Sequence, residues 1–84
     1  MSKEVTIYTF STCPFCIRAK ELLDRENIKY KEIEISNDRE KLDVLEQKTG
    51  HSTVPQIFVS DKFIGGCDDL MEIHSNGKFN DIFR

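Results

Sequence analysis

Hydrophobic and polar residues recur along this chain in patterns that predict alternating strands and helices. Glu4–Phe10 favours a strand, and because neither of its faces is strongly polar we expect it to be central and covered on both sides. Residues 17–23 place apolar side chains at helical spacing, so a helix follows. In Tyr30–Ile35 isoleucine alternates with glutamate, which is typical of an edge strand with one solvated face.

The middle of the chain predicts a second helix and then a hairpin. Asn37 and Glu40 have the spacing of a capping box, and Gly50 is a suitable residue to end the helix that they open. Gln56–Val59 and Lys62–Ile64 are short apolar strands separated by two residues, so they should pair as a hairpin.

The last third predicts one more helix and a final helical turn. The pair Gly65-Gly66 ends the second hairpin strand, and a helix is expected over residues 68–76. Phe79–Phe83 should pack back on the sheet. The element order is therefore β-α-β-α-β-β-α, and its first strand–helix–strand unit implies a right-handed parallel crossover.

Two cysteines stand between the first strand and the first helix, in the stretch Cys13-Pro14-Phe15-Cys16. If Cys13 caps the helix, Cys16 lies one turn in, on the same side of the axis and close enough to bridge to it. Pro14 suits the first helical turn because its missing N–H is not needed there. Cys16 continues the apolar stripe of Ala19 and Leu23, whereas Cys13 stands at the exposed helix end. We interpret the pair as a reversible dithiol/disulfide centre.

Composition narrows the class of protein. The 84 residues are 38% hydrophobic and 32% charged, which is typical of one globular domain over residues 1–84. The formal net charge of -3 gives no support to nucleic-acid binding. Met1–Glu4 lacks the apolar core of a signal peptide and no run is long enough to cross a bilayer, so we expect a cytoplasmic protein that does not associate with membranes. In a reducing compartment a Cys-x-x-Cys pair is more often redox-active or metal-binding than structural.

Three segments together resemble the glutaredoxins of the thioredoxin-like superfamily. They are Cys13-Pro14-Phe15-Cys16, Thr53-Val54-Pro55 and Gly65-Gly66-Cys67-Asp68-Asp69. The resemblance covers essentially the whole chain, because the predicted element order is also that of the family. It implies an α/β thioredoxin-like fold with a four-stranded mixed sheet in the order 2-1-3-4 flanked by helices. Strands 1 and 2 would be parallel, and strands 3 and 4 antiparallel.

The resemblance implies a glutathione-dependent thiol–disulfide oxidoreductase. Cys13 is expected to be the nucleophile, because only a thiolate attacks a disulfide and a helix N-terminus favours the anion. In the dithiol route Cys13 attacks a protein disulfide and Cys16 resolves the mixed disulfide. In the monothiol route Cys13 alone removes glutathione from a glutathionylated protein. Pro14, Phe15 and Pro55 support the active site, and Phe15 replaces the family's usual tyrosine.

Glutathione is the expected co-substrate, with no permanently bound cofactor and no metal. The family's Val-Pro bond is cis and exposes the backbone of Val54, which pairs with the cysteine of glutathione; the alternative is an ordinary trans proline at a strand edge. Amides at the start of the third helix suit the γ-glutamyl carboxylate, and an aspartate suits its ammonium; alternatively, the two aspartates only cap a helix. The predicted glutathione-binding residues are Cys13, Phe15, His51, Thr53, Val54, Pro55, Gly66, Cys67, Asp68 and Asp69.

Two positions depart from the family pattern. Glutaredoxins commonly have a basic residue three positions before the first active-site cysteine, where this chain has Phe10. A second basic residue often precedes the Thr-Val-Pro loop, and His51 occupies that position. Both usually help to hold the glycine carboxylate of glutathione. We therefore expect weaker glutathione binding, assisted by protonated His51 at mildly acidic pH.

Other interpretations of the same residues stay open at this point. A small glutaredoxin-like electron donor would be reduced by a thioredoxin reductase instead of glutathione. A metal or iron–sulfur module could combine the cysteine pair with Cys67 and either His51 or His74, although His74 is expected to be a surface or packing residue. The expected partners are glutathione, protein disulfides and glutathionylated proteins. Ribonucleotide reductase is a candidate substrate, and glutathione reductase acts indirectly. We expect a monomer.

Overall fold

The computed structural model describes residues 3–84. Met1 and Ser2, part of the segment in which no secretory leader is expected, lie outside the described residues. The elements follow in the order β1 (Val5–Thr9), α1 (Pro14–Arg25), β2 (Lys31–Glu34), α2 (Arg39–Thr49), β3 (Gln56–Val59), β4 (Lys62–Gly65), α3 (Cys67–Ser75) and α4 (Phe79–Phe83). The predicted order is confirmed, including the last helical turn.

The four strands form one mixed sheet in the order β2-β1-β3-β4. β1 pairs parallel with β2 and antiparallel with β3, and β3 pairs antiparallel with β4. The predicted sheet order and strand directions are confirmed. β1 is covered on both faces, as expected for a central strand. Its Val5, Ile7 and Thr9 side chains are buried on one face, and half-buried side chains lie on the other.

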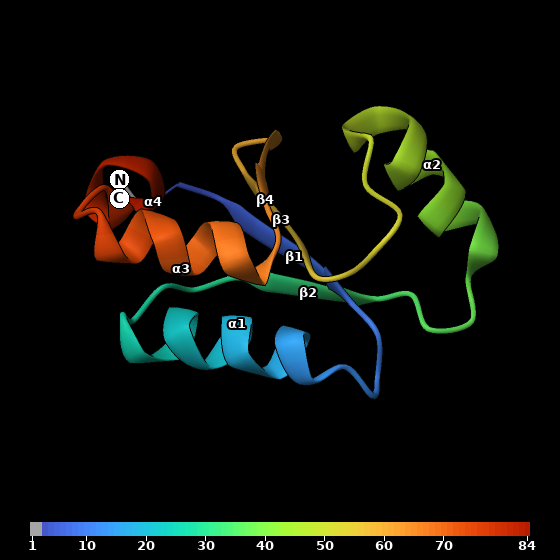
Figure 1. The fold of residues 1–84 in the computed structure, drawn as a ribbon, viewed down its shortest axis with the longest axis horizontal. Coiled ribbons are helices and arrows are strands. Elements are labelled where there is room, and N and C mark those ends of the chain that lie inside the picture. The colour runs from blue at the N-terminus through green and yellow to red at the C-terminus, as the bar shows by residue number, and fades with distance from the viewer. Residues whose placement is uncertain (1–2) are drawn as a thin grey trace.

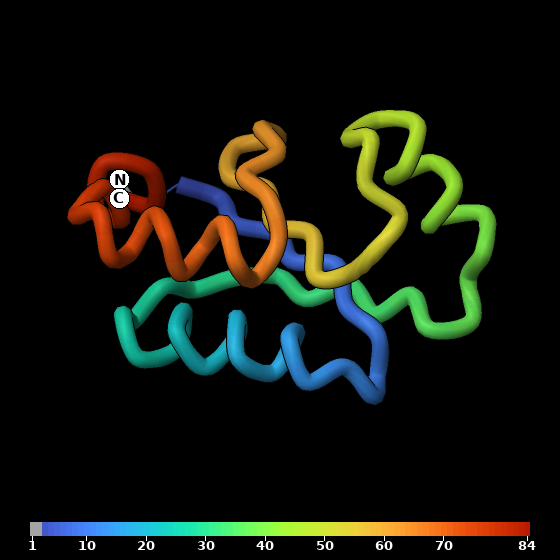
Figure 2. The backbone as a smooth tube through the Cα atoms, viewed as in Figure 1, coloured from blue at the N-terminus to red at the C-terminus, as the bar shows by residue number. Residues whose placement is uncertain are grey.

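Helices cover both faces of the sheet (Figures 1 and 2). On one face α1, α3 and α4 enclose the larger core, in which Leu23, Leu70 and Phe83 are almost fully buried. On the other face α2 places Leu45 against Phe58 and Ile35. The two layers of helices and the sheet between them make the three-layer α/β architecture that the sequence predicts. The chain ends meet, since the Lys3 ammonium donates to the carbonyls of Asp81 and Ile82 at 3.0 and 3.1 Å.

One predicted helix cap is wrong. The structure caps α2 with Asp38, whose carboxylate accepts a hydrogen bond from the Lys41 amide at 3.1 Å, and not with Asn37. Asp and Asn are nearly equivalent as caps, so the local pattern did not separate two neighbouring candidates. The predicted end of the same helix is confirmed, because Gly50 adopts a left-handed conformation with φ of 79°.

The two-residue turn between β3 and β4 is also confirmed. Ser60 and Asp61 both have positive φ, 49° and 67°, which is the conformation of a two-residue hairpin turn whose twist matches the strands. No helix within residues 3–84 is long and apolar enough to span a membrane.

Candidate active site

Cys13 caps the N-terminus of α1. Its backbone is extended, with φ of −131°, and Pro14 follows in the first turn. The Cys13 sulfur accepts a hydrogen bond from the Cys16 amide at 3.2 Å. The sulfur therefore lies at the positive end of the helix dipole and accepts an N–H from the first turn. The same residue is only partly buried, so the sulfur is within reach of a substrate.

Cys16 lies one turn further along and faces the core. It is 1% exposed and belongs to the buried face of α1 with Ala19 and Leu23. Burial, reinforced by the hydrogen bond with Cys13, raises the pKa of the Cys16 thiol to about 12. Cys16 is therefore a thiol at neutral pH, and the two cysteines differ in exposure and in reactivity.

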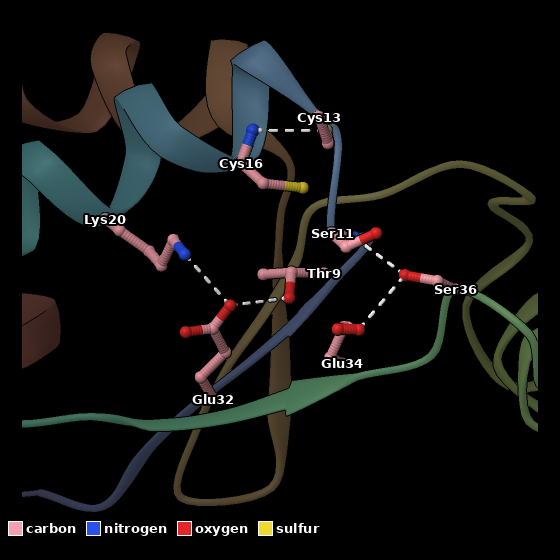
Figure 3. A network of polar contacts seen from close by, with 8 residues as sticks. All are labelled: Thr9, Ser11, Cys13, Cys16, Lys20, Glu32, Glu34 and Ser36. Carbon is pink, nitrogen blue, oxygen red and sulfur yellow. Dashed lines mark hydrogen bonds and ion pairs between the residues drawn. The ribbon is translucent and has the colours of Figure 1, made fainter.

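The loop before Cys13 is fixed to the edge of the sheet. The Ser11 amide donates to the Ser36 hydroxyl at 2.7 Å, and that hydroxyl lies 3.2 Å from the carboxylate of Glu34 (Figure 3). A backbone bond joins the same two segments, because the Ile35 amide donates to the Thr9 carbonyl at 2.8 Å. These bonds hold the turn that leads from β1 into the helix cap, so the position of the Cys13 sulfur depends on the end of β2.

The Thr53-Val54-Pro55 segment lies opposite Cys13. The Val54–Pro55 bond is cis, as the resemblance implied, and the Val54 carbonyl oxygen is 3.9 Å from the Cys13 sulfur. Gln56, which is 1% exposed, holds this loop in place. Its side-chain amide donates to the carbonyls of His51 at 2.8 Å and Thr53 at 3.0 Å, and its oxygen accepts from the Thr49 hydroxyl at 3.1 Å.

The N-terminus of α3 forms the third side of the site. The first bond of the helix runs from the Leu70 amide to the Gly66 carbonyl, so the three preceding amides have no partner within the helix. The Asp69 carboxylate accepts from the Gly66 amide at 3.2 Å. Gly65 has φ of +137°, and a Cβ there would approach the Asp69 Cβ to 2.6 Å, so this close turn requires glycine. Asp69 is thus engaged as a cap, whereas the carboxylate of Asp68 makes no hydrogen bond or ion pair within residues 3–84.

These segments enclose a groove of about 440 Å³ beside Cys13. Nine of the predicted site residues line it: Phe15, His51, Thr53, Val54, Pro55, Gly66, Cys67, Asp68 and Asp69. Cys13, Pro14 and Cys16 do not line the groove: Cys16 is buried, and the Cys13 sulfur lies next to the groove, 3.9 Å from the carbonyl oxygen of Val54. A larger hollow of about 930 Å³ lies near Ile28 and Phe83, away from every cysteine, so the thiol chemistry belongs to the smaller groove.

The two departures from the family pattern occupy different places. Phe10 packs with the α2-side core beside Leu45 and Phe58, so its ring is used for packing. His51 lines the groove, and its ring contacts Phe63 with centroids 5.1 Å apart. His51 is therefore the one basic side chain among the residues that line the groove.

The remaining candidates for metal binding do not assemble. Within residues 3–84 no group of three or more His, Cys, Asp or Glu side chains is placed to hold a metal ion. Cys67 is buried, which raises the pKa of its thiol, and it contributes to the core under α3. His74 lies on the far side of α3, where its ring contacts Phe79 and its Nε2 is 3.3 Å from Glu26.

Sequence reasoning missed Gln56 as a loop anchor. It was treated only as the start of a strand, yet it is the one amide in the otherwise apolar strand Gln-Ile-Phe-Val. A polar side chain in a strand that is buried on both faces must find hydrogen-bond partners, and that signal could have identified it.

The fold and the site define a class. A protein whose thioredoxin-like sheet places a half-buried thiol at a helix N-terminus, one turn before a buried thiol, is a dithiol redox protein. Comparison with known proteins refines this class. A family model described as glutaredoxin matches residues 5–64, and the chain belongs to the glutaredoxin family. It is therefore a glutathione-dependent thiol–disulfide oxidoreductase.

The sequences of individual relatives align with nearly the full length of this chain. Glutaredoxin 1 of Rickettsia prowazekii is 45% identical over 82 residues, covering 95% of this chain and 86% of the relative. Glutaredoxin 3 of Escherichia coli is 39% identical over 80 residues, covering 95% and 96%. Among solved structures, a buckwheat glutaredoxin–glutathione complex has a TM-score of 0.89 at 33% identity, covering 96% of this chain and 76% of that one. A glutaredoxin from Brucella melitensis has a TM-score of 0.87 at 38% identity, covering 98% and 89%.

Proposed function

We propose that glutathione binds in the groove beside Cys13, with Cys13 as the nucleophile and Cys16 as the resolving thiol. The observation that carries this proposal is the difference between the two thiols: the half-buried Cys13 sulfur accepts an N–H at a helix end, while Cys16 is buried and protonated. A solved relative in complex with glutathione supports the choice of ligand.

The groove matches the functional groups of the tripeptide. The unpaired amides of Cys67, Asp68 and Asp69 suit the γ-glutamyl carboxylate, and the Asp68 carboxylate suits the γ-glutamyl ammonium. The backbone of Val54 is positioned to pair with the cysteine, since its carbonyl lies next to Cys13. At the other end of the groove, His51 is available to bind the glycine carboxylate of glutathione.

Each of the two routes acts on a different class of protein substrate. In the dithiol route the Cys13 thiolate attacks a protein disulfide, Cys16 displaces the substrate, and two molecules of glutathione restore the dithiol. In the monothiol route Cys13 takes the glutathionyl group from a protein, and a second glutathione releases it. Ribonucleotide reductase is a candidate substrate for the first route.

The test compares two cysteine variants in two assays, both coupled to glutathione and glutathione reductase. Cys13→Ser is expected to abolish both routes. Cys16→Ser is expected to retain removal of glutathione from a glutathionylated protein and to lose reduction of a protein disulfide. Full protein-disulfide reduction by Cys16→Ser would contradict the assigned roles.

A parallel assay decides the source of electrons. If thioredoxin reductase supports turnover of the unaltered protein and the glutathione system does not, the groove does not serve glutathione and the protein is an electron donor of the other kind. We expect turnover with glutathione.

A further inference from the structure

A polar cluster lies behind the active site, on the α1 side of the sheet. The carboxylate of Glu32, on β2, accepts a hydrogen bond from the Thr9 hydroxyl at 2.7 Å and pairs with the Lys20 ammonium at 2.9 Å (Figure 3). Thr9 is fully buried and the Lys20 side chain is 27% exposed. A lysine on a helix surface normally extends into water, whereas this ammonium is held inward by Glu32, whose carboxylate Thr9 holds in turn.

The cluster lies next to the resolving thiol. Lys20 follows Cys16 by four residues, so the two side chains share one face of α1. In Figure 3 the Cys16 sulfur and the Lys20 side chain both point from α1 toward Thr9 on the central strand. The groups that act on the Cys16 thiol are Cys13 at the helix cap, the backbone of Phe10 and Lys20 from α1, and Glu32 from β2 joins Lys20 to Thr9 on β1.

We propose that Lys20 is a positioning residue for the resolving step: its ammonium, held by Glu32, stabilises the thiolate of Cys16 as that residue attacks Cys13. The inference rests on the proposed function, because it requires Cys16 to resolve a mixed disulfide. Lys20 touches no substrate and acts through Cys16 alone.

The step balances within the mixed disulfide. Cys16 loses its proton, and the electron pair of its thiolate forms a bond to the Cys13 sulfur. The bond between Cys13 and the substrate sulfur breaks, and its electron pair leaves on the substrate, which takes up a proton as a thiol. Cys16 is oxidised, the substrate sulfur is reduced, and no other reactant is needed.

A buried thiol needs such assistance. Burial raises the pKa of Cys16 to about 12, so the thiolate is scarce at neutral pH, and the charge of Lys20 acts in the opposite direction. A cation that is already fixed requires no rearrangement when the negative charge develops on the sulfur. The monothiol route does not use Cys16, so it should be indifferent to Lys20.

That difference gives the test. Lys20→Met is expected to slow reduction of a protein disulfide by about three- to tenfold at pH 7, because the thiolate loses its nearby cation. The defect, expressed as a fold-change, should stay the same as the pH rises from 7 to 9, because this range lies well below the pKa of Cys16 and the thiolate fraction rises with pH in both proteins alike. Removal of glutathione from a glutathionylated protein should change by less than about twofold.

Two further variants complete the experiment. Lys20→Arg, which keeps the charge, should restore most of the dithiol rate. Arg25→Met, which removes a cation from the last turn of the same helix, should affect neither route.

Each outcome is decisive. An unchanged dithiol rate in Lys20→Met, a defect that Lys20→Arg does not relieve, or equal losses in both routes would overturn the inference. The monothiol rate also reports correct folding of each variant. If the unaltered protein fails with glutathione in both assays, the proposed function itself fails, which is a different result from a loss confined to Lys20→Met.

Discussion

The side chain of Gln56 makes three hydrogen bonds: it donates two to the loop beside Cys13 and accepts one from Thr49 at the end of α2. The carbonyls of His51 and Thr53 lie in a loop that pairs with no strand. Backbone N–H groups therefore do not replace the two bonds that Gln56 donates to them. One buried amide therefore fixes the segment that carries both His51 and Val54.

Replacing Gln56 by alanine should loosen that loop. We expect a loss of about 1–3 kcal/mol in the free energy of unfolding, since buried polar partners are left unsatisfied, together with weaker glutathione binding. Urea denaturation and glutathione titration measure the two effects. Gln47→Ala, at an exposed glutamine of α2, is the matched control and should change stability by less than about 0.5 kcal/mol. Normal glutathione binding in Gln56→Ala would show that the loop needs no anchor.

His51 should make glutathione binding depend on pH. A histidine gains a proton between pH 8 and 5.5, and a cation in the groove attracts the glycine carboxylate. We expect affinity to rise as the pH falls, by up to about fivefold, because an exposed ion pair contributes about 0.2–1 kcal/mol.

His51→Asn should remove this dependence when affinity is titrated across that range. The same substitution at His74, the other of the two histidines, lies outside the groove and should leave the profile intact. Identical profiles for the unaltered protein and His51→Asn would refute the role of His51.

Among the elements, β2 combines two tasks. It is the edge strand that the sequence predicts, and its exposed glutamates are those of a solvated face. Yet Glu32 also ties the strand to α1 and to the central strand through Lys20 and Thr9. The alternating pattern revealed the strand but not this connection, because the partners come from two other elements.

The contacts of Glu32 with Thr9 and Lys20 predict how the stability of the fold varies with pH. The Thr9 hydroxyl and the Lys20 ammonium lower the pKa of Glu32 in the folded protein. A lowered carboxyl pKa stabilises the fold above the unfolded value of about 4.3 and ceases to do so as the pH falls through the folded value. The unaltered protein should therefore be more stable than Glu32→Gln at pH 7, by less than about 1 kcal/mol because the pair is partly exposed.

The gap between the two proteins should close as the pH falls from about 5 toward 3. Urea denaturation at several pH values measures it, and Glu21→Gln, at an exposed carboxylate of α1, is the control. A gap that is the same at pH 7 and pH 3 would show that Glu32 acts without its charge.

At the scale of the whole molecule, the last helical turn closes the larger core. Phe79 and Phe83 stack with ring centroids 4.6 Å apart and pack with residues of β1, α1 and α3. Since the two ends of the chain share this core, we propose that residues 1–84 fold as one glutaredoxin domain with a single cooperative transition.

Phe83→Ala should test whether the chain unfolds in one cooperative transition. A buried phenylalanine replaced by alanine costs about 3–5 kcal/mol, which is much of the stability of a domain this small. We expect the melting temperature to fall by more than about 12 °C. Val44→Ala, at a side chain that is 61% exposed, should change it little. A separate early transition in thermal denaturation would mean that α4 is not part of the same unit.

The resemblance to the glutaredoxins implied the sheet order, whereas the sequence by itself determined the element order and the position of the dithiol. It could do so because hydrophobic periodicity, turn residues and the Cys-x-x-Cys spacing are local signals. It also separated the two cysteines, since the helical stripe that includes Ala19 and Leu23 already places Cys16 on the buried side.

Only the tertiary structure decided which groups surround those thiols. The groove joins residues from α1, the loop before β3 and the start of α3, and their distances depend on how the sheet brings distant segments together. The inward ammonium of Lys20 and the buried amide of Gln56 have partners on other elements. Hydrogen bonds and ion pairs between elements leave little trace in local spacing, because each partner alone resembles an ordinary polar residue.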